Sequence, residues 1–199
     1  LLSEEHLPKL YWQGDSLSNF SGVDLPAKFV IKTNHDSGSV WICSGDCLPF
    51  PQNLVSEVDL ALSRTYGGAS GEFPYLLIRP QVLIEEFVPA ESEKDRPCDY
   101  KFHCVDGKVA FLQLICDRGK SPNEVLVDRN GEVLDFNLDP RFQGTREFRK
   151  PSNWTDLLAQ VETVAEGWKY VRVDSYLNGS RLLFGELTFF PHAGWYQGR

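Results

Sequence analysis

The feature that most limits how this chain can fold is its last long apolar segment, VRVDSYLNGSRLLFGELTFF, residues 171–190. Two runs rich in Val, Leu and Phe flank Asn178-Gly179, a pair that is typical of the turn in a β-hairpin. Each run nevertheless contains an acid, Asp174 in the first and Glu186 in the second. Because successive side chains of a strand face opposite sides of a sheet, the register of the hairpin decides whether the two carboxylates meet.

Two registers are compatible with this sequence. A two-residue turn at Asn178-Gly179 places Asp174 beside Leu183 and turns Glu186 to the other face. A three-residue loop over 177–179, with Gly179 in the left-handed conformation, exchanges the faces of the second strand. We favour the second register because it separates apolar from polar side chains. Its polar face consists of Arg172, Asp174, Glu186 and Thr188.

Two neighbouring carboxylates raise each other's pKa unless a cation lies between them. Hard oxygen ligands of this kind suit Mg²⁺, which usually takes one or two carboxylates together with phosphate oxygens of a substrate. The alternative interpretation is a solvated hairpin face with incidental charges, since exposed acids are common.

The length and composition narrow the class of protein. A chain of 199 residues is long enough for one domain or for two small lobes. Its net charge of −8 argues against a general nucleic-acid-binding protein. The sequence contains no apolar run long enough to span a membrane. Its five cysteines have no recognisable spacing, which predicts thiols in a reducing cytoplasm.

The pattern of apolar residues predicts strands and helices in mixed order. Residues 52–66 show helical spacing, and a second helix over 155–168 follows Ser152 or Asn153 as its N-cap. Strands are predicted at 28–32, 40–44, 81–88, 99–105, 108–117, 124–128 and 132–136, besides the closing hairpin. This order predicts an α+β fold built on antiparallel sheet.

Other polar residues stand at the ends or on one face of these predicted strands. Lys32 ends a strand directly before the loop TNHDSGS, and a cation beside a glycine-containing loop can hold phosphate oxygens. Asp99, Lys101 and His103 alternate along one strand and share a face. Each pattern also fits an ordinary half-solvated sheet.

Taken in order, five segments resemble the ATP-grasp superfamily, and in particular its TupA-like members, which are associated with teichuronopeptide synthesis. The resemblance runs from about residue 7 to residue 198. It rests on LPAKFVIKTNHDSGS, VLIEEFV, CDYKFHCVDGK, YVRVDSY and FGELTFFPHAG. The last segment is also similar to the metal-binding hairpin of D-alanine–D-alanine ligases.

The resemblance implies two α+β lobes with antiparallel sheets that grip ATP. It further implies a ligase that uses ATP and Mg²⁺ to activate a carboxylate as an acyl phosphate, which an amine then attacks. In this subfamily, an amino acid could be joined to a uronic acid for a cell-surface polysaccharide. The expected partners are therefore a saccharide or other small carboxylate and an amine.

The family's site residues can be carried onto matching positions of this chain. Lys32 and the loop residues His35, Ser37 and Gly38 would contact the nucleotide phosphates, with Lys101 as a second phosphate contact. The adenine hinge would be Glu85, Glu86, Phe87 and Val88, and Asp99 would hold the ribose. Arg172 would steady the developing negative charge, and the Mg²⁺ ligands would be Asp174, Glu186 and Thr188.

Two features depart from the family pattern. The usual Glu-x-Asn of the metal site is Glu186-Leu187-Thr188 here. The family also has a longer N-terminal region with another lysine, so residues 1–27 are expected to be its truncated remnant. The expected lobes are then residues 28–86 and 87–199.

Two other functions are compatible with these residues. A glycosyltransferase could serve the same polysaccharide synthesis, although the chain has no Asp-x-Asp triplet at a strand end. A nucleotide-binding domain without catalytic activity is the other alternative, because Thr188 replaces the usual asparagine and the N-terminal region is short.

Overall fold

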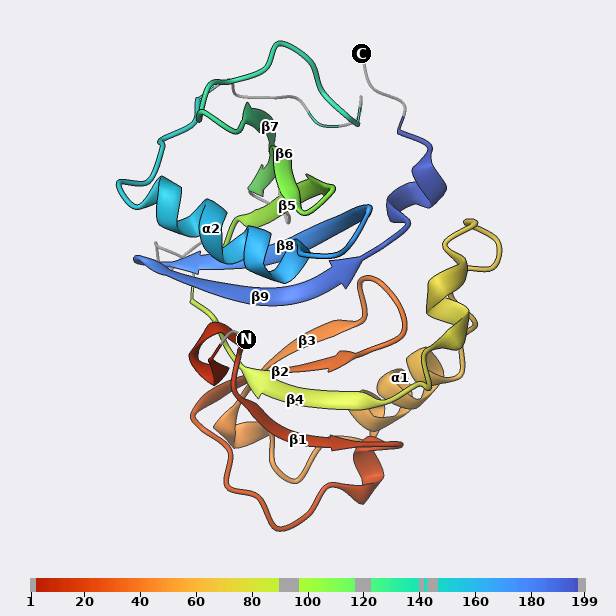
Figure 1. The fold of residues 1–199 in the computed structure, drawn as a ribbon. Helices are drawn as coiled ribbons and strands as arrows, with labels where there is room; N and C mark the ends of the chain where they lie inside the picture. Colours follow the sequence, from red (N-terminus) through yellow and green to blue (C-terminus); the bar gives the residue numbers. More distant parts are fainter. Residues whose placement is uncertain (1–2, 90–96, 117–122, 140–141, 143–146, 197–199) are drawn as a thin grey trace. The chain divides into compact units, whose positions relative to one another are not determined.

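The computed structural model describes residues 3–89, 97–116, 123–139, 142 and 147–196. Their contacts divide the chain into two compact units, one over Pro8–Phe87 and one that combines Leu1–Leu7 with Val88–Arg199. Each unit contains one antiparallel sheet (Figure 1). The expected α+β class with two antiparallel sheets is thereby confirmed.

The unit over Pro8–Phe87 is built on a four-stranded sheet in the order β1-β4-β2-β3. Its strands are β1 (Leu10–Gly14), β2 (Lys28–Thr33), β3 (Val40–Ser44) and β4 (Val82–Glu86). Its helices are α1 (Gln52–Leu62) and the 3₁₀ turns η2 (Leu17–Asn19), η3 (Gly45–Cys47) and η4 (Phe73–Leu77).

Alternation along the two central strands decides which face of this sheet is covered. Phe29 and Ile31 on β2 and Ile84 on β4 are fully buried and pack with Val58 of α1. Lys32 follows Ile31 directly on β2 and therefore lies on the opposite face of the sheet.

Helix α1 is shorter than the predicted 52–66 and ends at Leu62. The carbonyl of Arg64 is within hydrogen-bond distance of the His35 ring, with Nε2 at 3.2 Å. The backbone therefore leaves the helix, and the ring of Tyr66 packs edge-on against Tyr75 at a centroid distance of 4.9 Å.

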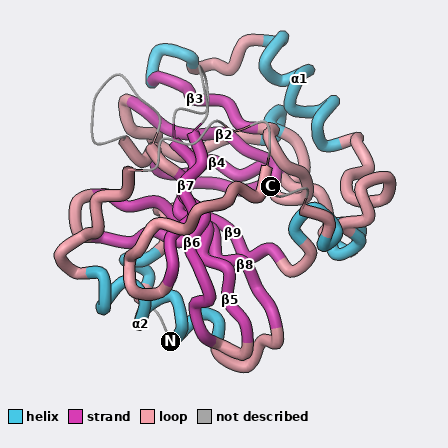
Figure 2. The backbone as a smooth tube through the Cα atoms, turned by 90° about the horizontal axis from the view of Figure 1, so that it is seen from above, coloured by secondary structure: helices cyan, strands magenta, loops and turns pink. Residues whose placement is uncertain are grey.

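The second unit contains a five-stranded sheet in the order β7-β6-β5-β8-β9 (Figure 2). Its strands are β5 (Asp99–Val105), β6 (Lys108–Cys116), β7 (Asn123–Asp128), β8 (Tyr170–Asn178) and β9 (Arg181–Thr188). Its helices are α2 (Trp154–Ala165), η1 (Glu4–His6) and η5 (Pro191–Gly194). Asn153 holds the N-cap position of α2, as predicted.

Helix α2 covers one face of the five-stranded sheet (Figure 1). Residues that alternate along the strands, such as Phe102 and Val173, pack there against Leu157 and Val161 of the helix. The side chains between them in sequence point to the other face. This second face carries the polar residues of the site described below.

The predicted strand over 132–136 is wrong, because it contributes only an isolated bridge between Val127 and Val133. The carboxylate of Asp128 accepts hydrogen bonds at 2.8 Å from the backbone N–H groups of Asn130 and Glu132. The Asp128 side chain thus binds backbone N–H groups that a neighbouring strand would otherwise bind, and it closes a tight turn.

The closing hairpin has neither of the two connections weighed from the sequence. Asn178 pairs with Arg181 around a two-residue turn at Gly179-Ser180. The register then shifts inside β9, where Gly185 is an extra residue between the pairs Ser175–Phe184 and Asp174–Glu186. This bulge places Glu186 opposite Asp174 and on the same face, so the predicted juxtaposition of the two acids is present although the predicted loop is wrong.

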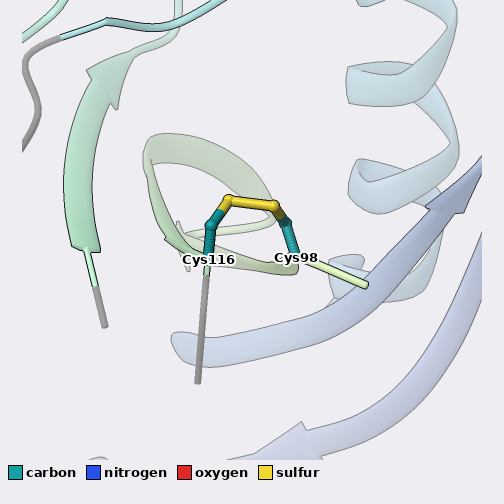
Figure 3. The surroundings of a disulfide bond; sticks show 2 residues. All are labelled: Cys98 and Cys116. Atoms are coloured by element: carbon teal, nitrogen blue, oxygen red, sulfur yellow. A yellow bond between two sulfur atoms is a disulfide. The ribbon is translucent and has the colours of Figure 1, made fainter. Parts of the chain in front are cut away.

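The prediction that all cysteines are thiols is also wrong in this structure. Cys98 and Cys116 form a disulfide, which joins the strand ends beside the ladder pair Asp99–Ile115 (Figure 3). No local spacing of cysteines indicates this pair, because the two residues meet only through the β5–β6 register. Cys43, Cys47 and Cys104 are thiols.

Glu162 connects helix α2 to the five-stranded sheet, and its contacts predict a contribution to stability. The Glu162 carboxylate accepts from the backbone N–H of Val109 at 3.1 Å and from Lys108 Nζ at 2.9 Å, and it also pairs with Arg129. Burial by itself raises the pKa of Glu162, but hydrogen bonds from Arg129 and Lys108 outweigh it and lower the pKa to about 2.

A carboxyl with a lowered folded-state pKa stabilises the fold above its unfolded-state pKa and loses that contribution as the pH falls toward the folded value. We therefore expect Glu162→Gln to lower the free energy of unfolding at pH 7 by about 1–2 kcal/mol, since both cations are partly exposed. Urea unfolding should show this difference shrinking between about pH 4.5 and pH 2. Glu166→Gln, at the exposed end of the same helix, is the matched control; an equal loss in both variants would contradict the assignment.

Candidate functional site

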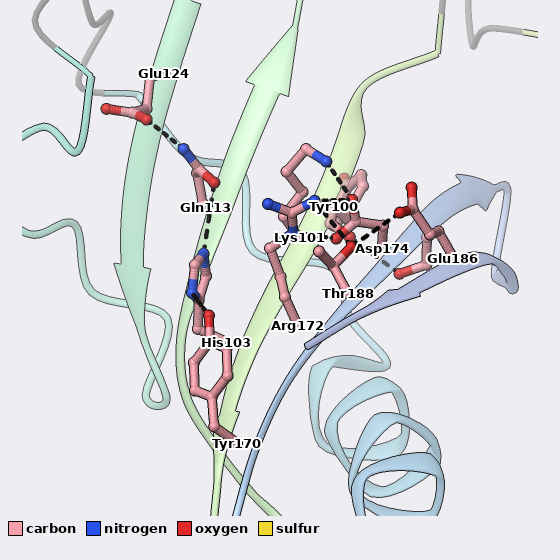
Figure 4. Close-up of polar contacts among 11 residues, drawn as sticks. Tyr100, Lys101, His103, Gln113, Glu124, Tyr170, Arg172, Asp174, Glu186 and Thr188 are labelled. Carbon is pink, nitrogen blue, oxygen red and sulfur yellow. Dashed lines mark hydrogen bonds and ion pairs between the residues drawn. The ribbon is translucent and has the colours of Figure 1, made fainter. Parts of the chain in front are cut away.

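The face of the five-stranded sheet opposite α2 holds two adjacent rows of mostly polar side chains (Figure 4). Cross-strand pairing across β6, β5, β8 and β9 sets each row. One row consists of Gln113, Lys101, Asp174 and Glu186, and the next consists of Phe111, His103, Arg172 and Thr188. Residues from four distant stretches of sequence thus become direct neighbours.

Asp174 lies at the centre of these rows and is paired with two cations. Arg172 donates from Nε to Oδ1 at 2.6 Å and from Nη2 to Oδ2 at 2.8 Å, and Lys101 Nζ pairs with Oδ2. All three residues are nearly buried. The ion pair of Arg172 with Asp174 is therefore buried and not exposed.

Electrostatic interactions keep Asp174 and Arg172 charged. Burial alone would raise the pKa of Asp174, but Lys101 and Arg172 lower it below its ordinary value. Burial alone would lower the pKa of Arg172, but Asp174 raises it well above its ordinary value. The Asp174 carboxylate is therefore ionised between its two partners, Arg172 and Lys101.

Glu186 and Thr188 complete the candidate metal site on β9. Arg172 Nη2 donates to Thr188 Oγ1 at 3.1 Å, and Thr188 Oγ1 donates to Glu186 Oε1 at 3.1 Å. Thr188 therefore holds the Glu186 carboxylate in place from the same strand, two residues away. Glu186 is exposed whereas Thr188 is buried, so the carboxylate faces outward from the sheet.

The donor set can be compared with what Mg²⁺ requires. In the described part of the chain, no group of three or more His, Cys, Asp or Glu side chains could by itself hold a metal ion. Mg²⁺ commonly takes one or two carboxylates and completes its shell with phosphate oxygens and water. Asp174 and Glu186 are cross-strand partners, so one face of the hairpin supplies two carboxylates of the kind that pattern needs, with Thr188 as a neutral oxygen nearby.

A chain of hydrogen bonds extends the polar face toward β7 (Figure 4). His103 Nδ1 lies 2.9 Å from the Tyr170 hydroxyl, and its Nε2 lies 3.5 Å from Gln113 Oε1. Gln113 Nε2 donates to Glu124 Oε1 at 2.5 Å. Glu124 Oε2 accepts from the backbone N–H of Leu138 at 2.7 Å, so the chain links the loop after β7 to the centre of the sheet.

His103 is neutral in this environment. Burial lowers its pKa to about 3, and the charge of Arg172, its cross-strand neighbour, acts in the same direction. A neutral ring beside the guanidinium avoids like-charge repulsion within the row. The sequence had pointed to His103 only through its alternation with Asp99 and Lys101.

No pattern in the sequence predicted four residues of this site, namely Gln113, Glu124, Tyr170 and Tyr196. Gln113 is the one polar residue within the apolar run 109–116, and this alone could have marked it. The others lie beside aromatic or apolar residues, without a local pattern.

In the unit over Pro8–Phe87, Lys32 forms an ion pair with Glu85. Lys32 Nζ lies 2.6 Å from Glu85 Oε2, and both side chains are partly buried on the sheet face opposite α1. Glu86 points to the other face, where its carboxylate accepts from the backbone N–H of Lys9 at 3.1 Å. The ring of Phe87 lies under Lys28 Nζ at 3.9 Å.

The loop after β2 separates its three predicted phosphate contacts. Ser37 and Gly38 are exposed, and Gly38 has the positive φ of 97° that favours glycine. His35 is buried instead and lies against the Arg64 carbonyl. The structure therefore does not bring His35 together with Ser37 and Gly38 at the loop surface.

The remaining predicted residues lie near the division of the chain and at the start of β5. Phe87 ends one compact unit and Val88, which is buried, begins the residues of the other. Asp99 begins β5 on the same face as Lys101, directly after Cys98 of the disulfide. It is partly exposed.

Residues 6–197 match the family model described as TupA-like ATPgrasp, which covers nearly the whole chain. The chain therefore belongs to the TupA-like ATP-grasp family. A comparison with curated protein sequences found no match.

Several solved structures match most of this chain at low sequence identity. D-alanine–D-alanine ligase from Bacillus anthracis is 14% identical, with a TM-score of 0.48, over 92% of this chain and 51% of that one. The ATP-grasp ligase PsnB, complexed with a minimal precursor, is 10% identical, with a TM-score of 0.44, over 91% and 45%. The macrocyclase MdnC from Microcystis aeruginosa is 11% identical, with a TM-score of 0.39, over 96% and 50%. The chain thus spans about half the length of these proteins.

Proposed function

We propose that this protein is an ATP- and Mg²⁺-dependent ligase that joins a carboxylate to an amine. The observation that supports this most is the cross-strand pair Asp174–Glu186, flanked by the buried cations Lys101 and Arg172. Phosphoryl transfer depends largely on positioning and on neutralising negative charge. Family membership over residues 6–197 supports the same activity.

A Mg²⁺ ion held by Asp174 and Glu186 would neutralise the negative charge of the ATP phosphate oxygens. In the first step, a carboxylate oxygen of the substrate attacks the γ-phosphorus of ATP, the bond to the β-phosphate oxygen breaks, and ADP leaves. In the second step, an amine nitrogen attacks the acyl carbon and loses a proton, and inorganic phosphate leaves. Lys101 and Arg172 would stabilise the charge that develops on the transferred group.

Within this activity, we propose a uronic-acid-type carboxylate and an amino acid as the substrates, for a cell-surface polysaccharide. The support is membership of the TupA-like family. We place the reaction in the cytoplasm because it consumes ATP. In the described part of the chain, no helix has the length and apolarity that crossing a bilayer requires.

The experiment that tests the ligase is ADP formation with a panel of uronic acids and amino acids. We expect ADP to form only when a carboxylate and an amine are both present, together with Mg²⁺. Transfer of a sugar from a nucleotide sugar without ATP consumption would overturn the proposal in favour of a glycosyltransferase. ATP binding without turnover on any pair would favour a nucleotide-binding domain.

Lys32 gives a separate prediction about nucleotide binding. We expect Lys32→Ala to weaken ATP binding about tenfold or more, because it removes a charge-assisted phosphate contact. Its melting temperature should fall only slightly, since the lost ion pair with Glu85 is partly exposed. Calorimetric titration of ATP measures the affinity, and Lys9→Ala, an exposed lysine of the same unit, is the control. Unchanged affinity in folded Lys32→Ala would remove Lys32 from the nucleotide site.

A further inference from the structure

The Tyr196 hydroxyl is a buried polar group that the fold does not satisfy. Within the described ranges, it is one of three buried side-chain polar atoms without a hydrogen-bond partner. The other two are His35 Nδ1, in the unit over Pro8–Phe87, and Gln160 Oε1, on α2. Only Tyr196 lies on the polar face of the five-stranded sheet. A buried hydroxyl without a partner is unfavourable, so its presence requires an explanation.

The position of Tyr196 is fixed by an unusual stretch of backbone. After β9, the chain turns through His192, Ala193 and Gly194, which all have positive φ values, of 50°, 52° and 80°. Two of these residues are not glycine, and the left-handed conformation is unfavourable for them. Strained backbone of this kind is often retained where it positions a functional group. Here the turn directs the chain back toward His103.

The Tyr196 ring is held among aromatic rings next to the cation of the site. Its centroid lies 5.8 Å from that of His103, and the rings meet edge to face. His103 is itself fixed, because it stacks on Phe111 at 4.3 Å and is hydrogen-bonded to Tyr170. Burial raises the pKa of Tyr196, whereas the charge of Arg172 and a polar contact between its guanidinium and the Tyr196 hydroxyl oppose that rise. This contact does not have the geometry of a hydrogen bond.

We propose that Tyr196 is a substrate-contacting residue, whose hydroxyl donates a hydrogen bond to a phosphoryl oxygen held beside Arg172. This inference rests on the proposed ligase, in which that oxygen belongs to the acyl phosphate and then to the phosphate product. The hydroxyl is an additional neutral donor, and it adds affinity for the anion without adding charge to the cluster around Asp174. Neutral His103 is the positioning residue that sets the ring.

The chain offers a matched pair of variants, because each of two tyrosines on this face has one hydroxyl and only one of them is satisfied. Tyr170→Phe removes the hydroxyl that is hydrogen-bonded to His103. Tyr196→Phe removes the hydroxyl without a protein partner. Losing a satisfied hydrogen bond should lower the melting temperature by about 2–4 °C, whereas losing the unsatisfied one should leave it unchanged or raise it.

Binding of inorganic phosphate, measured by calorimetry with saturating Mg²⁺ and ADP, tests the contact itself. We expect Tyr196→Phe to raise the dissociation constant for phosphate about tenfold, which corresponds to about 1.4 kcal/mol. Tyr170→Phe should stay within about twofold of the wild type, since its hydroxyl would not touch the anion.

The inference is overturned if the wild type binds no phosphate, if Tyr196→Phe binds it as the wild type does, or if Tyr196→Phe loses as much thermal stability as Tyr170→Phe. If the proposed ligase function is wrong, the expected result is different: the wild type binds neither ATP nor ADP. In that case, phosphate titration without nucleotide still decides whether Tyr196 and Arg172 form an anion site.

Discussion

Arg172→Lys is expected to reduce ligase turnover about a hundredfold or more, while ATP affinity stays within a few-fold of the wild type. The Arg172 guanidinium makes two parallel hydrogen bonds to Asp174 and a third to Thr188. A lysine ammonium keeps the charge but cannot reproduce this planar set of donors. An interaction made mainly in the transition state lowers turnover without a matching change in nucleotide binding.

The measurement is the rate of ADP formation and the ATP dissociation constant on the same folded variant. Arg181→Lys is a suitable control, because this exposed arginine lies at the turn end of the same hairpin. Near-normal turnover in Arg172→Lys would show that Arg172 has no role in the chemistry. Equal losses of turnover and ATP affinity would instead assign it to nucleotide binding.

Asp174→Asn is expected to destabilise the protein by about 3–5 kcal/mol, the largest effect on stability that this site predicts. The substitution leaves Lys101 and Arg172 nearly buried without the carboxylate that neutralises them. Because the pKa of Asp174 is lowered in the fold, the carboxylate stabilises the protein above its unfolded-state pKa of about 4. That contribution is lost as the pH falls below this value.

Glu186→Gln separates this electrostatic role from metal binding. Both substitutions remove a candidate Mg²⁺ ligand, but Glu186 is exposed and interacts with the Thr188 hydroxyl. We therefore expect Glu186→Gln to cost less than about 1 kcal/mol of stability and still to weaken Mg²⁺-dependent ATP binding. Urea unfolding at pH 7 and Mg²⁺ titration of ATP binding measure the two properties. Equal destabilisation by both substitutions would contradict the ion-pair argument.

Local pattern was sufficient for most elements of this fold. Strict alternation predicted the strands around Phe102 and Val173, because one face of each must pack against α2. The incorrect prediction of a strand over 132–136 also has a local cause. The Asp128 side chain binds the backbone N–H groups of that turn, and apolar patterning does not report such competition.

The closing hairpin shows how a correct site followed from a wrong connection. Separation of polar from apolar side chains required Asp174 and Glu186 to share a face, whether a loop or a β-bulge produced that register. The sequence could not distinguish a three-residue loop at Leu177 from a bulge at Gly185, since both shift the register by one residue.

By itself, the sequence determined which side chains lie on the polar face of each strand, because alternation is a local property of the backbone. The family resemblance added the order of the segments, which the match over residues 6–197 bears out. Beyond the closing hairpin, which the Asn178-Gly179 pattern predicted, the tertiary structure decided which strands are neighbours. Pairing of β5 with β8 makes Lys101 and Arg172 joint partners of Asp174, pairing of β5 with β6 joins Cys98 to Cys116, and the turn after β9 brings Tyr196 to His103. Such contacts depend on long-range register and chain reversal, and no local spacing encodes them.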